Sequence, residues 1–180
     1  MDVRDSKGRS TRRSVGRAEM AGSRAEIEEA LDEMDRLLVA SSKAGDWTIW
    51  AGCLSQDVEF HDTIYGTYLG RQAVSDFVVA VHAPFPHLRY ERDWALIDVN
   101  RQEVIFQQRM ILPEPEGYAG APFATDVWSR HRYAGDGLWS LKQDVTLSGA
   151  QADANFRGWM EAGGRFAAPP LAPPTSKESE

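Results

Sequence analysis

The chain has 180 residues, of which 42% are hydrophobic and 26% charged, and its net charge is −7. This length and apolar fraction suit one domain with its own core and exclude a chain that is disordered throughout. No apolar run approaches the roughly 18–20 residues of a membrane span. The single cysteine excludes an internal disulfide and agrees with a cytoplasmic location, and the acidic balance argues against nucleic acid as the main partner.

Both ends of the chain are expected to lie outside the folded domain, which we place at residues 23–166. Residues 1–22 have almost no large apolar side chains, which predicts a disordered basic arm. Residues 1–24 hold seven basic and three acidic residues, so the rest of the chain, with 13 basic and 24 acidic residues, carries −11. Residues 167–180 are rich in proline, which predicts an extended, disordered tail.

Two amphipathic helices are predicted at the start of the domain. Ser23 and Glu26 have the spacing of a capping box, which marks the beginning of a helix. The apolar residues that follow recur every three or four positions, as in one helix face: Ile27, Ala30, Leu31, Met34, Leu37 and Leu38. Gly45 is expected to end this helix and Asp46 to cap the next, whose apolar positions are Trp47, Trp50, Ala51 and Leu54.

The remaining elements are a hairpin, a third helix, four strands and a last helix. Residues 58–65 predict a strand with a short return, and residues 71–82 predict a helix. Four strands are predicted at residues 88–99, 103–112, 123–133 and 138–147, and the last helix begins at Ser148. This order indicates an α+β domain in which helices cover one face of a curved antiparallel sheet and leave a pocket in its concavity.

Asp62 is the first candidate for chemistry because of its place in a predicted strand. Side chains alternate along a strand, so Asp62 shares a face with Val58, Phe60 and Ile64. A carboxylate on an apolar face is desolvated, which raises its pKa toward values that suit a general base. The structural alternative is that Asp62 ends the strand and caps the turn before Gly66.

Asp126 is the second candidate. It shares a strand face with Trp128, but both faces of this strand are mixed, so periodicity alone does not place it. If Asp126 faces the same cavity as Asp62, the two pKa values separate, and one carboxylate serves as a base while the other carboxyl donates a hydrogen bond. The alternative is an ion pair with Arg109 or Arg130 on an exposed strand.

Seven further residues are candidates for binding a substrate. They are polar or aromatic side chains on predicted strand faces or at the predicted edge of the pocket: His61, Tyr65, His82, Gln107, Arg109, Trp128 and Gln143. Gln143 lies among apolar neighbours, where an amide needs a partner or a wet cavity, and structural hydrogen bonding is its alternative role. Alternation points His61 away from the pocket, so that it reaches the rim only through a bulge.

The sequence predicts neither a cofactor nor a metal. It contains no phosphate-binding glycine loop and no Gly-x-Ser-x-Gly nucleophile motif. The four histidines and the cysteine do not have the spacing of a zinc site. The carboxylates are therefore the main candidates for chemistry.

Three local strings resemble the SnoaL-like group of the NTF2-like superfamily. They are KAGDW at residues 43–47, LSQDVEFHD at residues 54–62, and GRQAV at residues 70–74 followed by Phe77. Asp126-Val-Trp128 and Trp139 resemble the closing hairpin of the same group. Over residues 24–162 the resemblance implies a cone-shaped, curved antiparallel sheet wrapped on helices around an internal pocket, in a fold that is often dimeric through its sheet.

The same resemblance implies roles for both carboxylates. Compared with the ketosteroid isomerases of this superfamily, Asp62 matches the proton-shuttling aspartate and Asp126 the aspartate that donates to the oxyanion. Leu38 stands near the position of the isomerases' tyrosine, the other oxyanion donor, so the resemblance points to acid–base chemistry in general rather than to steroid isomerisation. Polyketide cyclases also rely on an aspartate from the late strands, a role that Asp126 could fill.

The expected function is a cofactor-free acid–base enzyme, namely an isomerase, cyclase or dehydratase, that acts on a small apolar carbonyl compound. One of the two aspartates would remove a proton next to the carbonyl, and the other would stabilise the enolate with help from Gln107, Arg109 or Gln143. Epoxide hydrolysis is a further option. The alternative is a binding or dimerisation module without catalysis. The expected partners are a small-molecule substrate and a second copy of the chain, with neither nucleic acid nor membrane.

Overall fold

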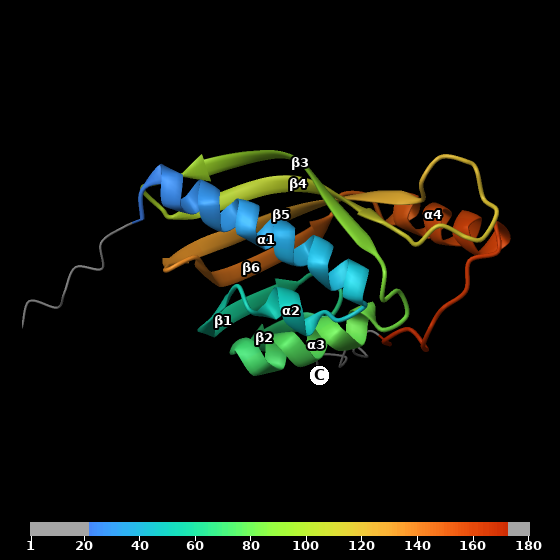
Figure 1. Cartoon of the computed structure of the whole chain (residues 1–180), viewed down its shortest axis with the longest axis horizontal. Coiled ribbons are helices and arrows are strands. Elements are labelled where there is room, and N and C mark those ends of the chain that lie inside the picture. Colours follow the sequence, from blue (N-terminus) through green and yellow to red (C-terminus); the bar gives the residue numbers. More distant parts are fainter. Residues whose placement is uncertain (1–21, 173–180) are drawn as a thin grey trace, which may run out of the picture.

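The computed structural model describes residues 22–172, so the predicted arm at residues 1–22 lies outside the described part except for Gly22, whose amide donates to Gln102 Oε1 at 2.6 Å (Figure 1). The elements are α1 (Arg24–Ala44), α2 (Thr48–Ala51), β1 (Leu54–Asp62), β2 (Gly66–Leu69), α3 (Arg71–His82), β3 (Arg89–Asp98), β4 (Glu103–Ile111), β5 (Ala124–Gly135), β6 (Leu138–Thr146) and α4 (Gly149–Glu161). The six strands form one sheet in the order β2-β1-β6-β5-β4-β3.

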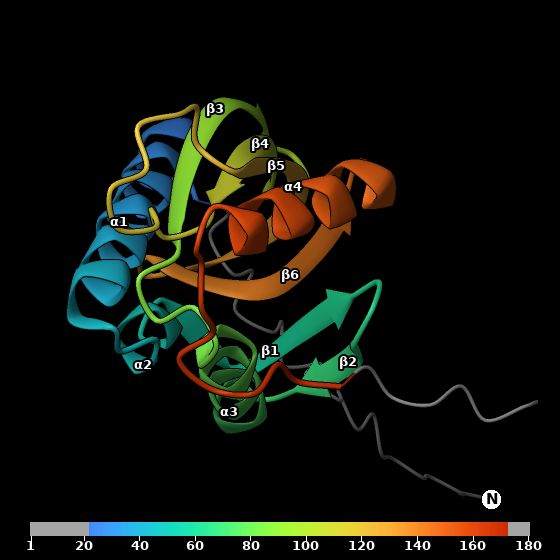
Figure 2. The ribbon, with the colours of Figure 1, turned by 90° about the vertical axis from the view of Figure 1, so that its right-hand side faces the viewer.

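The sheet curves around the helices, as Figures 1 and 2 show from two sides. Helix α1 packs on β3, α3 packs on β1 and β2, and α4 contacts β5. All strand pairs are antiparallel except β1 and β6, the second and third strands of the sheet, which run parallel. The predicted α+β class, with a curved sheet that covers helices, is confirmed.

Helix α1 has the two ends that its sequence predicts. The Ser23 side chain accepts a hydrogen bond from the Glu26 amide, and the Glu26 carboxylate accepts one from the Ser23 amide. Gly45 ends the helix with φ +67°, a left-handed conformation that glycine adopts without strain. The predicted apolar face is buried, and Ile27, Leu31 and Met34 are at most 1% exposed.

The second helix is much shorter than its apolar pattern predicts. It comprises only Thr48–Ala51, and Leu54 already belongs to β1. Trp50 and Leu54 are both buried in the core, so the helix-like spacing of apolar residues arises from a short turn followed by a strand. Apolar residues buried before and after the turn have the same spacing as the apolar residues of one helix face. Periodicity alone therefore misplaced the start of β1.

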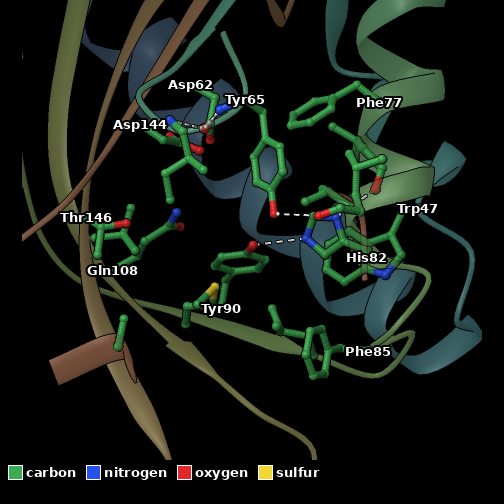
Figure 3. A pocket seen from close by; sticks show the side chains of 18 of the residues that line it. Trp47, Asp62, Tyr65, Phe77, His82, Phe85, Tyr90, Gln108, Asp144 and Thr146 are labelled. Atoms are coloured by element: carbon green, nitrogen blue, oxygen red, sulfur yellow. Dashed lines mark hydrogen bonds between the residues drawn. The ribbon is translucent and has the colours of Figure 1, made fainter. Parts of the chain in front are cut away.

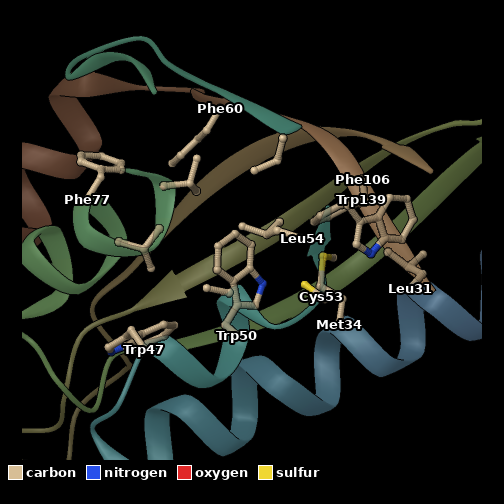
Figure 4. Close-up of a cluster of buried hydrophobic side chains, with 14 of the residues drawn as sticks. Leu31, Met34, Trp47, Trp50, Cys53, Leu54, Phe60, Phe77, Phe106 and Trp139 are labelled. Atoms are coloured by element: carbon tan, nitrogen blue, oxygen red, sulfur yellow. The ribbon is translucent and has the colours of Figure 1, made fainter. Parts of the chain in front are cut away.

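The core lies between α1, α2, α3 and the concave face of the sheet (Figure 4). Its largest fully buried side chains include Trp139, Trp159 and Phe106. Cys53 is also in this cluster, and burial raises the pKa of its thiol to about 12. Trp159 of α4 joins the core by donating from Nε1 to the carbonyl oxygen of Pro113 at 2.7 Å.

The first residues of the predicted tail contact the domain. The amide of Ala167 donates to the carbonyl oxygen of Pro84 at 3.0 Å, and Leu171 packs against the core cluster. The rest of the predicted tail, residues 173–180, lies outside the described part. None of the helices in residues 22–172 combines the length and the apolar character that crossing a membrane requires.

Replacing Leu31 with alanine tests the packing of α1. Leu31 is 1% exposed, so Leu31→Ala should lower the free energy of unfolding by about 2–5 kcal/mol, because it removes buried methyl groups and leaves a cavity. Urea denaturation measures the change. Val39 of the same helix is 47% exposed, and Val39→Ala should change the free energy by less than about 0.5 kcal/mol. Equal losses in both variants would contradict this packing.

Candidate functional site

A cavity of about 520 Å³ opens between α3, α4 and the concave face of the sheet (Figure 3). Its volume lies within the range of small-molecule sites. Aromatic side chains make up much of its wall: Trp47, Trp50, Phe60, Phe77, Phe85 and Phe156. Phe166, Pro170 and Leu171, which follow α4, also line it. A cavity with these walls favours a flat, largely apolar ligand.

Asp62 stands at the end of β1 and lines the cavity. Its Oδ1 accepts hydrogen bonds from the amides of Ile64 and Tyr65 at 2.7 and 2.8 Å. The carboxylate therefore caps the turn between β1 and β2, as the structural alternative predicts, and it also faces the cavity. The two amides fix the orientation of the carboxylate, while Oδ2 makes no hydrogen bond within the described residues.

Lys142 and Asp144 point into the cavity from β6, the strand next to β1. The Lys142 ammonium is paired with the Asp144 carboxylate, and it lies 4.8 Å from the centre of the Phe60 ring. Lys142 is only 8% exposed. A buried ammonium is stable only when it is paired and hydrogen-bonded, and the Asp144 carboxylate provides this partner for Lys142 inside an apolar cavity.

A chain of hydrogen bonds holds Asp144 in place. The hydroxyl of Ser129 donates to Asp144 Oδ1 at 2.6 Å, and the Gln108 amide donates to Ser129 Oγ at 3.2 Å. Ser129 and Gln108 are buried on β5 and β4, so the chain crosses three neighbouring strands. These bonds restrict the Asp144 carboxylate to one orientation, and through it the ammonium of Lys142.

A second polar pair, His82 and Tyr90, lies on another part of the cavity wall (Figure 3). His82 Nδ1 is 2.8 Å from the carbonyl oxygen of Val78, and His82 Nε2 is 2.9 Å from the hydroxyl oxygen of Tyr90. The His82 ring stacks on Trp47 with 3.8 Å between ring centres. Burial lowers the pKa of His82 to about 4 and raises that of Tyr90, so both groups are neutral near pH 7.

His131 is the most deeply buried polar residue of the cavity wall. It is 1% exposed, and neither ring nitrogen has a hydrogen-bond partner within the described residues. Burial and the nearby Lys142 both lower its pKa, so the ring is neutral. Its ring packs between Phe106 and Trp139. An unpartnered imidazole in a core is costly, which makes this the least satisfied point of the cavity.

The structure brings three of the predicted site residues into the cavity, namely Asp62, Tyr65 and His82. The other six lie on the outer face of the sheet or outside the cavity: His61, Gln107, Arg109, Asp126, Trp128 and Gln143. Asp62 and Asp126 therefore do not share a cavity, and the condition on which the predicted carboxylate pair depended is not met.

The residues outside the cavity have other contacts. His61 Nδ1 lies 3.0 Å from Thr67 Oγ1, as its predicted opposite orientation implies. Arg109 pairs with Glu91 at 2.6 Å, and Trp128 Nε1 donates to Gln107 Oε1 at 3.1 Å. These contacts form the outer surface of the sheet rather than the wall of a pocket.

A β-bulge explains why Gln143 was expected to face inward and Lys142 and Asp144 were missed. Along β6, Trp139 is paired with Tyr133, but Leu141 is paired with the adjacent Arg132, so β6 has an extra residue at this point. The bulge reverses the alternation, and Trp139 and Lys142 both face inward. The polar residues at every second position after the bulge, ending at Thr146, are the sequence pattern that could have revealed this wall.

Within residues 22–172, no three His, Cys, Asp or Glu side chains are grouped so that they could hold a metal ion. The polar groups that line the cavity are carboxylates that do not cluster, an ammonium, two neutral imidazoles and hydroxyl groups. These groups can hydrogen-bond an organic ligand and move protons at its oxygen and carbon atoms.

The low pKa of His82 predicts a dependence of stability on pH. In the unfolded chain this pKa is about 6.5, so below pH 6.5 the unfolded state binds more protons than the folded state. The contribution to stability is complete above pH 6.5 and falls by about 3 kcal/mol as the pH approaches 4. His82→Asn should reduce this loss, measured by urea denaturation at pH 7 and pH 4.5.

His61→Asn is the control for this experiment, because His61 lies outside the cavity and its side chain is 38% exposed. It should leave the loss of stability between the two pH values as it is in the unmodified protein. The prediction is contradicted if His82→Asn has the same pH dependence as the unmodified protein. His131 adds a dependence of the same sign, so the His82 variant should retain part of the effect.

Comparisons with known proteins agree with this fold. The model of the SnoaL-like domain matches residues 35–141. Comparison with curated proteins gives no significant match. Three crystal structures share the fold. An NTF2-like protein from Anabaena variabilis is 14% identical, with a TM-score of 0.56 over 73% of this chain and 98% of that one.

The second structure, from Jannaschia sp., is described as a SnoaL-like polyketide cyclase and is 16% identical, with a TM-score of 0.53 over 83% of this chain and 99% of that one. The third, TerC co-crystallised with polyporic acid, is 15% identical, with a TM-score of 0.53 over 76% of this chain and 98% of that one. At these identities the likeness concerns the fold alone. The family match covers more than half of the sequence, and the chain therefore belongs to the SnoaL-like domain family.

Proposed function

We propose that this protein is a cofactor-free acid–base enzyme that acts on a small, largely apolar carbonyl compound. Asp62 would remove a proton from the carbon next to the carbonyl group, and Lys142 would donate a hydrogen bond to the carbonyl oxygen as it becomes an enolate. The observation that carries the proposal is that Asp62 and Lys142 face one aromatic-walled cavity from adjacent strands.

The geometry of the two strands supports this pairing. Asp62 is the register partner of Asp144, and Phe60 is that of Lys142, so Asp62 and Lys142 are two residues apart on neighbouring strands. Neighbouring strands lie about 5 Å apart, which a lysine side chain spans easily. A base and a hydrogen-bond donor so close together can hold the α-carbon and the oxygen of the same carbonyl compound.

The surroundings of both groups suit their roles. The free Oδ2 of Asp62 can accept a proton while the two backbone amides keep the carboxylate oriented. The Lys142 ammonium has three donors, and Asp144 accepts from it, which leaves donors for a ligand. In a cavity with little water, a fixed positive charge stabilises a developing enolate more strongly than it would in solvent.

In this proposal Asp144, rather than Asp126, is the second carboxylate of the site, and its part is to position Lys142. Isomerisation, aldol cyclisation and dehydration all begin with the same removal of a proton, so the choice among them depends on the substrate. A second candidate function is binding of an organic ligand without catalysis. The double hydrogen bond that ties Asp62 Oδ1 to its turn favours this candidate, because it gives Asp62 a structural role.

Proton exchange in a simple ketone separates these two functions. The protein should accelerate the exchange of the C1 protons of 2-tetralone in D₂O, observed by NMR. Asp62→Asn should lower this rate by about 100-fold or more, because it removes the base. Asp126→Asn is the matched control, since it makes the same chemical change on the outer face of the sheet, and its rate should equal that of the unmodified protein.

The outcomes distinguish the candidates. An unchanged exchange rate in Asp62→Asn, or a lower one in Asp126→Asn, would contradict the proposed mechanism. Binding of 2-tetralone by the unmodified protein, measured by calorimetry, without any exchange above that of the buffer would favour the binding module.

We also propose that a second copy of the chain covers the outer face of the sheet. Four adjacent strands expose an apolar side chain there: Leu96, Ile105, Trp128 and Val145. Trp128 meets Trp94 edge to face with 5.8 Å between ring centres. Leu96 lies opposite Ile105, and Trp128 lies opposite Val145, on neighbouring strands. Exposed apolar side chains grouped on one face are typical of an interface, and a face presented by every copy can pair with itself about a two-fold axis.

Analytical ultracentrifugation tests this assembly. The unmodified protein should sediment as a dimer at micromolar concentrations, and Trp128→Glu should sediment as a monomer, because a carboxylate would be buried in the interface. Val79→Glu adds the same charge at an exposed position of α3 and should remain dimeric. A monomeric unmodified protein would contradict the proposal.

A further inference from the structure

The direction of the hydrogen bonds around His82 is fixed by chemistry. The carbonyl oxygen of Val78 can only accept, so His82 Nδ1, at 2.8 Å, must carry the proton. In a neutral imidazole the other nitrogen then has a lone pair and can only accept. The hydroxyl of Tyr90, at 2.9 Å from Nε2, is therefore the donor in this second bond.

Packing keeps this arrangement in place. Trp47 stacks on the His82 ring, and Trp47 Nε1 donates to the carbonyl oxygen of Pro86 at 3.0 Å. The pKa of His82, lowered to about 4 by burial, keeps the ring neutral at physiological pH, so the lone pair on Nε2 persists. The proton of Tyr90 is thus committed to His82 and is not available to a ligand.

The consequence concerns what Tyr90 offers to the cavity that it lines. With its proton engaged, the phenolic oxygen presents only lone pairs, so it can accept a hydrogen bond from a ligand but cannot donate one. A ligand hydroxyl gains a bond here, whereas a ketone or ether oxygen meets lone pairs. Lys142 has the opposite character, because an ammonium can only donate.

We infer that the cavity selects a flat, apolar carbonyl compound that carries a free hydroxyl group, which donates to Tyr90 while the carbonyl oxygen faces Lys142. The carbonyl end of this inference rests on the proposed function. The hydroxyl end rests on the Val78–His82–Tyr90 chain alone. Tyr90 is therefore assigned as a residue that determines specificity and takes no part in proton removal.

A matched pair of fluorescent ketones tests the inference. The probes are 6-hydroxy-2-acetylnaphthalene and its 6-methoxy analogue, which differ only in whether the oxygen can donate. The unmodified protein should bind the hydroxyl probe about tenfold more tightly in a fluorescence titration, since one hydrogen bond is gained and the methyl ether cannot form it.

Two variants assign the preference to Tyr90 and to the direction of its bond. Tyr90→Phe removes the acceptor, so the ratio of the two dissociation constants should fall to about one. His82→Leu keeps the hydroxyl but frees its proton, so Tyr90 can donate to the methoxy oxygen, and the ratio should fall as well. A role of Tyr90 in packing alone would not produce the second result.

Tyr118→Phe is the matched control, because it removes a phenolic hydroxyl that donates to Ala121 in the loop before β5, away from the cavity. It should keep the tenfold preference. The inference is overturned if the unmodified protein binds the methoxy probe equally well, if Tyr90→Phe keeps the preference, or if neither probe binds.

This test fails or succeeds independently of the proposed catalysis. 2-Tetralone has no hydroxyl group, so its exchange depends on Asp62 and not on Tyr90. If the protein prefers the hydroxyl probe but does not accelerate the proton exchange of 2-tetralone, Tyr90 still determines the specificity of a protein that binds without catalysis. If the protein accelerates the proton exchange but binds both probes equally, the catalytic proposal stands and the role of Tyr90 in specificity is refuted.

Discussion

The parallel pairing of β6 with β1 is the contact on which the candidate site depends. It places Asp144 beside Asp62 and Lys142 beside Phe60, so two strands that are distant in sequence contribute to the same patch of wall. The same pairing positions the aromatic ring of Phe60 next to the ammonium of Lys142. A shift of β6 by one residue would turn Lys142 and Asp144 to the outer face and leave Asp62 and Phe60 without them.

Two sets of polar side chains, one charged and one neutral, thus lie in a largely apolar cavity. On the side of β1 and β6, a carboxylate and an ammonium provide charge, and a chain of hydrogen bonds through Ser129 and Gln108 holds them. On the side of α3 and β3, His82 and Tyr90 provide neutral groups, and each donates its proton in a hydrogen bond within the protein. The apolar walls strengthen both sets, because each interaction takes place where water is scarce.

The sequence predicts those parts of the fold in which local chemistry decides the structure. The Ser23 cap, the apolar face and Gly45 define α1, and the alternation along β1 places Asp62 on the inner face and His61 on the outer one. These predictions need only regular geometry within a single helix or strand.

The rest depends on contacts that no local pattern encodes. The bulge in β6 reverses the alternation of side chains along that strand. Regular alternation therefore predicted that Gln143 faces the cavity and missed Lys142. Both faces of β5 are mixed, so the inward turn of His131 and the outward turn of Asp126 were settled by pairing with β4 and β6. The bond between His82 and Tyr90 joins the end of α3 to β3, and only tertiary packing brings these two residues together.

The burial of Cys53 has a practical consequence. It is the single cysteine of the chain, it is 3% exposed, and its high pKa keeps the thiol protonated and unreactive in the folded state. A thiol reagent can therefore reach it only when the core opens at the junction of α2 and β1. The chain thus contains its own reporter, and the rate at which the thiol becomes labelled measures how often the core opens around Cys53.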